Sequence, residues 1–229
     1  MSPTMTKQQA IPAPTRAPAV PRDVRATGAT RIVVSTFGVL AGLAGIEHGV
    51  GELLQGSVRP EGLVIQSWPD WQAMEVLNGE PAMTVVPSLL VTGMLAVIVA
   101  LVVGVWSAGF VARRHGGLVL ILLSLLLLLV GGGFGPPLLG LIIGIGATRI
   151  GAVPRRQPGS VSRALGRVWP WILGAAVMGY LSLLPGTVLL GQLLGVENPG
   201  LVAGLSAFSF AGLLLALAAA WAQDRVRAA

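Results

Sequence analysis

The chain has 229 residues, of which 54% are hydrophobic and 10% are charged, with a net charge of +6 and a mean hydropathy of +0.80. A soluble domain carries about 25% charged residues and a disordered chain is polar, so this composition argues against both classes and predicts a protein embedded in the lipid bilayer. The absence of cysteine excludes disulfides, thiolate nucleophiles and cysteine-ligated metal centres.

The N-terminal segment, residues 1–30, contains five prolines and no helical or strand periodicity, which predicts a disordered cytoplasmic tail. Six apolar segments follow, and a crossing of roughly 30 Å of hydrocarbon needs about 20 residues. They predict an all-α integral membrane protein, a six-transmembrane-helix bundle over residues 31–223 with short loops and a short cytoplasmic tail at 224–229. The approximate helices are 32–55, 82–106, 117–132, 138–153, 171–194 and 201–221.

The third and fourth segments are short and are separated by Gly131–Pro137, whose adjacent prolines cannot continue a helix. A tight hairpin and a re-entrant fourth segment are both compatible with this spacing. Six crossings with both termini in the cytoplasm would place every basic residue except Arg59 on the inner side, as the positive-inside rule requires. This placement of basic residues on the cytoplasmic side explains the net positive charge, so we do not expect nucleic-acid binding. Lys7 is the only lysine among the basic residues, a bias that suggests a GC-rich bacterial coding sequence, and we expect the plasma (inner) membrane as its location.

The longest outer connection runs from residue 56 to residue 81. Within it, Trp71, Met74 and Leu77 recur every three residues between Asp70, a suitable N-cap, and Gly79, a suitable C-terminal glycine. This pattern predicts a short helix that lies on the outer membrane face or covers the bundle.

Three ionisable residues, Glu47, His48 and Glu52, interrupt the outer part of the first apolar segment. Glu47 lies about 24 Å along the helix from Arg31, which places it below the outer membrane boundary. A charge costs ~2.5–3.5 kcal/mol at the centre of a membrane helix and less toward its ends, so such residues usually face a bundle interior or a wet cavity. His48 and Glu52 are four residues apart and can pair, whereas Glu47 points about 100° away from His48 and needs a partner from elsewhere.

Two interpretations of this cluster remain open. In the first, the acidic and histidine side chains bind a divalent cation or relay protons. In the second, the helix end reaches the lipid headgroups, where His48 and Glu52 are solvated. Glu80 has two interpretations as well, because it can cap the second helix before Pro81 or meet Glu47 and His48 at the outer face. The sequence identifies neither a metal nor a cofactor.

Glycines predict close helix packing at two places. Gly38, Gly42, Gly45 and Gly49 form a stripe on one face of the first helix, and Gly140 and Gly144 form a GxxxG pair in the fourth. The leading hypothesis is a multi-pass membrane protein that handles ions, protons or a small solute through Glu47, His48, Glu52 and Glu80. The alternatives are an accessory subunit that binds other membrane proteins through its glycine-rich faces, and a membrane-embedded enzyme that uses Glu47 and His48. The substrate and the oligomeric state are not predicted.

Overall fold

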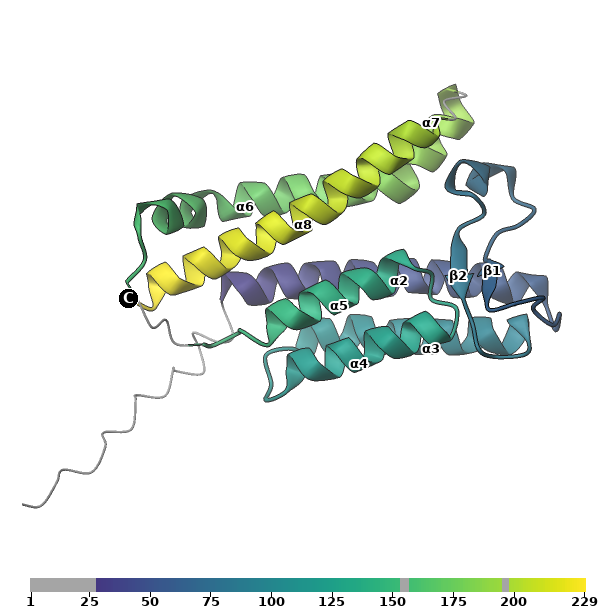
Figure 1. The fold of residues 1–229 in the computed structure, drawn as a ribbon, viewed down its shortest axis with the longest axis horizontal. Helices are drawn as coiled ribbons and strands as arrows, with labels where there is room; N and C mark the ends of the chain where they lie inside the picture. Colours follow the sequence, from purple (N-terminus) through teal and green to yellow (C-terminus); the bar gives the residue numbers. More distant parts are fainter. Residues whose placement is uncertain (1–27, 153–156, 195–197) are drawn as a thin grey trace, which may run out of the picture.

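The computed structural model describes residues 28–152, 157–194 and 198–229, and the chain is mostly helical (74%) (Figure 1). The tail predicted at residues 1–30 lies almost entirely outside the described residues. The long elements are α2 (Ala29–Gln55), α3 (Leu89–Gly109), α4 (Gly116–Leu129), α5 (Gly135–Ala147), α6 (Ser160–Leu181), α7 (Thr187–Leu194) and α8 (Pro199–Arg227). The short elements are the strands β1 (Val64–Gln66) and β2 (Pro81–Met83), the 3-10 helix η1 (Gln72–Leu77) and the π-helical turn η2 (Ser182–Gly186).

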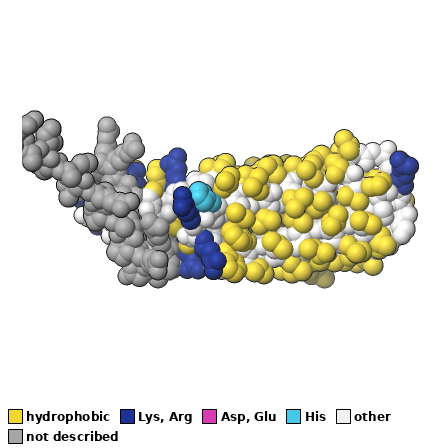
Figure 2. Space-filling model, turned by 90° about the horizontal axis from the view of Figure 1, so that it is seen from below, with side chains coloured by type: hydrophobic (Ala, Val, Ile, Leu, Met, Phe, Trp, Pro, Cys, Tyr) yellow, Lys and Arg dark blue, Asp and Glu magenta, His cyan; other side chains and the backbone are white. Residues whose placement is uncertain are grey.

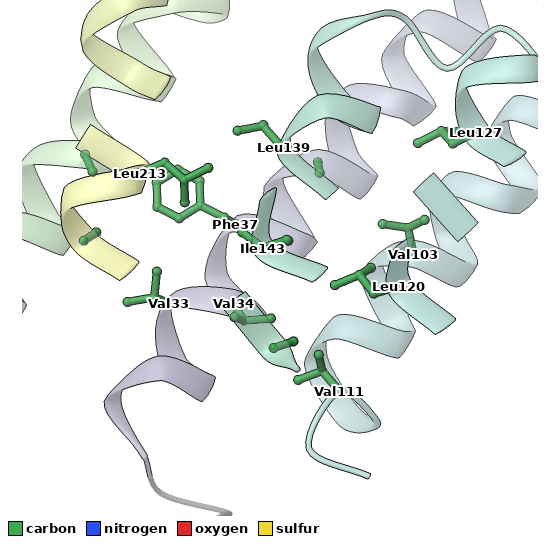
Figure 3. Close-up of a cluster of buried hydrophobic side chains, with 14 of the residues drawn as sticks. Val33, Val34, Phe37, Val103, Val111, Leu120, Leu127, Leu139, Ile143 and Leu213 are labelled. Carbon is green, nitrogen blue, oxygen red and sulfur yellow. The ribbon is translucent and has the colours of Figure 1, made fainter. Parts of the chain in front are cut away.

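Helix α2 is the central element and packs against α3, α5 and α8. Its fully buried Phe37 lies between Leu213 of α8 and Leu139 and Ile143 of α5 (Figure 3). Helices α6 and α8 pack against each other as a pair, with α8 providing most of the contact to α2. The apolar core therefore runs along α2 and joins the pair to the other helices.

The glycine stripe of α2 packs against α3 within the same chain. A Cβ at Gly42 would lie 2.8 Å from the carbonyl oxygen of Ala100, and one at Gly49 would lie 2.9 Å from that of Gly93. Gly144 of α5 allows a similar approach to α4, because a Cβ there would lie 2.6 Å from Cγ1 of Ile121. The prediction that these glycines allow close helix approach is confirmed, and both faces are covered inside the chain.

Three of the described helices are long and apolar enough to span a membrane, namely Ala29–Gln55, Leu89–Gly109 and Gly200–Arg227. Helices α4 and α5 have 14 and 13 residues and are therefore only about 21 and 20 Å long, shorter than the hydrocarbon core. Hydrophobic side chains cover most of the face in Figure 2, with basic side chains near its two ends. Together these features indicate a membrane-embedded protein.

Several predicted boundaries differ from the structure. The second helix begins at Leu89 instead of residue 82, because Pro81–Met83 pair with Val64–Gln66 as an antiparallel hairpin. The predicted fifth helix, 171–194, starts at Ser160 and continues through Pro170, and the sixth extends from Pro199 to Arg227. Apolarity marks the part of a helix suited to hydrocarbon, whereas the helix itself continues as long as its backbone hydrogen bonds do.

The predicted outer helix exists as the 3-10 helix η1, but its N-terminal flank differs. Trp71 instead of Asp70 precedes it, without a side-chain cap, and Asn78 ends it in the left-handed conformation. Gly79 follows, also with positive φ. A 3-10 helix brings residues three apart onto one line, which matches the spacing of Trp71, Met74 and Leu77.

The arginine-bearing ends of the helices lie together at one end of the molecule, and the β1–β2 hairpin lies at the other (Figure 1). At the arginine end, the Asp224 carboxylate of α8 accepts hydrogen bonds from the backbone N–H groups of Ala29 and Thr30, at 2.7 and 2.9 Å. The negative charge thus satisfies two free donors at the N-terminus of α2 and complements its dipole.

Candidate functional site

Helix α2 directs its ionisable residues into the protein at the hairpin end. The His48 side chain is 5% exposed and Glu52 is fully buried. Gly51 allows Trp68 to pack flat against the helix beside them, because a Cβ there would lie 2.7 Å from the indole ring. The interpretation in which His48 and Glu52 are solvated at a helix end is therefore wrong: protein surrounds both side chains.

Glu80 enters the same region from the outer connection. The hairpin holds it through hydrogen bonds from Ser67 N–H to the Glu80 carbonyl (3.1 Å) and from Trp68 N–H to the Gly79 carbonyl (3.0 Å). Asn78, Gly79 and Glu80 all have positive φ, at 55°, 65° and 51°. This conformation costs a non-glycine residue roughly 1–2 kcal/mol, and such strain is often found at functional sites.

This backbone turn brings Glu80 to His48, with Nε2 of His48 3.4 Å from Oε2 of Glu80. Glu80 is only 6% exposed. The alternative in which Glu80 caps the second helix is wrong, because α3 begins nine residues later, at Leu89, with Ser88 as its N-cap residue.

The Glu47 carboxylate completes a cluster of three candidate ligands. One atom from each of Glu47, His48 and Glu80 lies within 4.8 Å of the other two. Both carboxylate oxygens of Glu47 and Oε2 of Glu80 are shielded from solvent and form no hydrogen bond of good geometry among the described residues, although the two carboxyls approach each other and Glu47 approaches the Trp68 indole. Buried carboxylate oxygens without partners are costly, so this arrangement favours a ligand that would satisfy them.

Ser67 links His48 to the fourth predicted residue, Glu52. Its Oγ lies 3.0 Å from Nδ1 of His48 and donates to Oε1 of Glu52 at 3.4 Å. Because the hydroxyl donates to Glu52, its oxygen accepts from Nδ1–H, and the lone pair of Nε2 faces Glu80. His48 and Glu52 therefore do not pair directly, although helical spacing suggested that they could. Ser67, which the sequence did not identify as a site residue, bridges them.

The turn between α4 and α5 closes over this network. Gly131 and Gly133 have φ of 92° and 76°, and a Cβ would overlap the Glu52 carboxylate at Gly131 and the His48 ring at Gly133. Gly131 N–H donates to the Met83 carbonyl at 2.9 Å, and Thr84 pairs with Val130. The sequence predicted a turn here, but not that its glycines make room for the two ionisable side chains.

A cavity of about 220 Å³ adjoins the cluster, with His48 and Glu80 in its wall. Its other walls come from α2, the start of α5, α6, η2 and α8, and they are largely apolar. Glu52 and Ser67 do not line it. The cluster is therefore shielded from bulk water but borders a space between the helices.

Burial and the adjacent Glu47 carboxyl together raise the pKa of Glu80 well above its ordinary value. Without another cation, this raised pKa favours the protonated form of Glu80. Two carboxylates and a neutral imidazole in a dry site need compensating positive charge, which either protons or one divalent cation can supply. Chemically, the arrangement suits proton sharing or metal binding.

Comparison of the chain with models of known protein families, with curated proteins and with solved structures finds no match.

Proposed function

We propose that this is a multi-pass plasma-membrane protein that binds a divalent metal ion between Glu47, His48 and Glu80 near the outer face. In this proposal six membrane segments place both termini in the cytoplasm. The positions of the described arginines support that orientation, because all except Arg59 belong to helix ends or turns of the opposite end (Figure 1). The short α4–α5 pair enters from the cytoplasmic side and returns to it.

The observation that carries the metal assignment is the convergence of three ligand atoms whose buried carboxylate oxygens form no hydrogen bond of good geometry among the described residues. Zn²⁺ binds nitrogen and carboxylate oxygen at about 2.0–2.2 Å, which separates neighbouring tetrahedral ligands by about 3.4 Å. Nε2 of His48 and Oε2 of Glu80 lie 3.4 Å apart. The widest separation, up to 4.8 Å, would close through side-chain movement.

The surroundings of His48 favour metal binding as well. Metal-binding histidines usually donate their second ring N–H to an oxygen, which fixes the tautomer and the ring orientation. Ser67 and Glu52 provide that connection, leaving Nε2 directed at the cluster. One imidazole and two carboxylates suit Zn²⁺, Mn²⁺ or Fe²⁺, and three protein ligands leave a coordination position open, as in catalytic zinc sites.

The other hypotheses have less support. Transport needs a polar path, yet the buried polar side chains toward the arginine end are small hydroxyls such as Thr30 and Ser107. An accessory subunit would need glycine-rich faces, but those of α2 and α5 are covered by α3 and α4. A membrane-embedded enzyme is the favoured second candidate, because a cavity borders two of the three ligands.

Elemental analysis of the purified protein tests the metal assignment. We expect about one equivalent of a transition metal in the wild type and less than a tenth of that in Glu47→Gln and Glu80→Gln, which keep the side-chain shape but remove the charge. Glu75→Gln is the matched control, since Glu75 lies exposed in η1 of the same connection. Wild-type protein that binds no Zn²⁺, Mn²⁺ or Fe²⁺ after reconstitution would refute the metal assignment and leave a proton-sharing cluster.

The absence of cysteine provides a clean test of the topology. Single cysteines at Gly62, in the outer connection, and at Arg114, between α3 and α4, are treated with a membrane-impermeant maleimide. We expect labelling of Gly62→Cys in intact cells and of Arg114→Cys only after lysis. The reverse pattern would overturn the orientation.

A further inference from the structure

The cavity beside the candidate metal centre lies where the α6–α8 pair meets the other helices. Its volume is about 220 Å³, and its apolar wall includes Ala44 of α2, Phe134 before α5, and Val202 and Phe210 of α8. Helix α8 diverges from α2 toward the hairpin end (Figure 1), and the cavity lies in that half of the molecule. Pockets between packed helices are common ligand sites.

The polar side chains that line this cavity include two members of the cluster. His48 and Glu80 line it, together with Tyr180 of α6 and Ser206 of α8, while no Lys or Arg is found among its described lining residues. The π-helical turn η2, which contains Pro185, contributes Leu183 to the wall. Single π-helical turns within helices are frequent at functional sites. An occupant therefore needs an apolar body to fill the cavity and a polar group that can reach His48 and Glu80.

Charge balance restricts that polar group. A divalent cation with the two carboxylates and a neutral imidazole is already electrically neutral. An anionic ligand would add an uncompensated charge in a buried site, which is costly, whereas a carbonyl or hydroxyl oxygen can fill the open coordination position without doing so. The volume corresponds to about seven groups of the size of a water molecule, at ≈30 Å³ each.

We propose that the cavity binds the chain of a neutral, lipid-like amphiphile whose carbonyl or hydroxyl oxygen coordinates the metal held by Glu47, His48 and Glu80. This inference rests on the proposed metal centre. It assigns the ligand class of that centre: an uncharged amide, ester or alcohol with an apolar segment of about seven heavy atoms, the number of water-sized groups that fit the cavity.

The test uses Co²⁺-substituted full-length protein in lipid nanodiscs, because the visible absorption of Co²⁺ reports its ligands directly. Octanamide and octanoate are titrated in parallel, since they share a chain length and differ in charge. We expect octanamide to change the Co²⁺ spectrum with saturation, at a half-saturating concentration at least tenfold below that of octanoate.

Two variants narrow the cavity without replacing a metal ligand. Ser206→Leu and Ala44→Leu should retain the Co²⁺ spectrum and weaken the octanamide response at least tenfold. Ala207→Leu is the control, because Ala207 is exposed on the same helix.

The outcomes separate the two proposals. Co²⁺ binding without an octanamide response, or with a response that both narrowing variants retain, overturns the cavity assignment and leaves the metal centre standing. Octanoate binding as tightly as octanamide overturns the neutral ligand class. Failure of the wild type to bind Co²⁺ overturns both proposals.

Discussion

Gly133→Ala is the most informative single substitution in the α4–α5 turn. Gly133 has a φ of 76°, and a Cβ there would overlap the His48 ring at Nε2. The left-handed conformation costs alanine roughly 1–2 kcal/mol, and overpacking of a filled interior costs typically 1–3 kcal/mol. We therefore expect a loss of about 2–5 kcal/mol in the free energy of unfolding, together with loss of metal binding because His48 is displaced.

Gly135→Ala is the matched control two residues away. Nothing lies within 4 Å of a Cβ at Gly135, the first residue of α5, so alanine causes no overlap there, and its cost is limited to the restriction that Pro136 places on a preceding residue with a Cβ. The two variants, Gly133→Ala and Gly135→Ala, are compared by thermal unfolding followed by tryptophan fluorescence. Metal content is measured on the same samples. For a chain of this size each kcal/mol shifts the midpoint by about 2–4 °C. If Gly133→Ala unfolded within 1 °C of Gly135→Ala and kept its metal, the account of this turn would be refuted.

Three further predictions concern other contacts. Ser67→Ala should lower metal affinity about 10–100-fold, as loss of a residue that orients a metal-bound histidine does; retention of full affinity in a metal-buffered titration would contradict the bridge. Asp224→Ala should lower stability by about 0.5–2 kcal/mol through loss of the α2 cap and leave metal content unchanged; a loss of metal would contradict the separation of the two ends. In metal-free protein, the raised pKa of Glu80 means that the folded state holds a proton the unfolded state releases. Stability should therefore fall as the pH rises above about 4.5, by at most about 1.4 kcal/mol per unit. Glu80→Gln should flatten this slope in urea titrations at several pH values; an unchanged slope would assign it to another group.

The sequence by itself determined the helical, lipid-embedded character of the chain, since long apolar runs with few charges have no other stable solution in a bilayer. It also indicated the close packing of α2, because glycines spaced four, three and four apart share one face of a helix. Glu47, His48 and Glu52 stood out for the same local reason, as ionisable side chains in an apolar helix. The boundaries at Leu89 and Ser160 were not predictable from apolarity, which does not report where hydrogen bonding ends.

Only the tertiary structure brought Glu80 and Ser67 to His48. Both come from the connection between two helices, where side-chain direction depends on the β1–β2 register and on three successive left-handed residues, Asn78 to Glu80. No periodic pattern in the sequence predicts this course of the backbone. The role of Gly133 depends on the same fact: its missing side chain matters because His48, 85 positions earlier in the chain, occupies that space. Periodic patterns report which face of a single element is buried, whereas a site assembled from a helix, a hairpin and a turn exists only once long-range packing has placed all three.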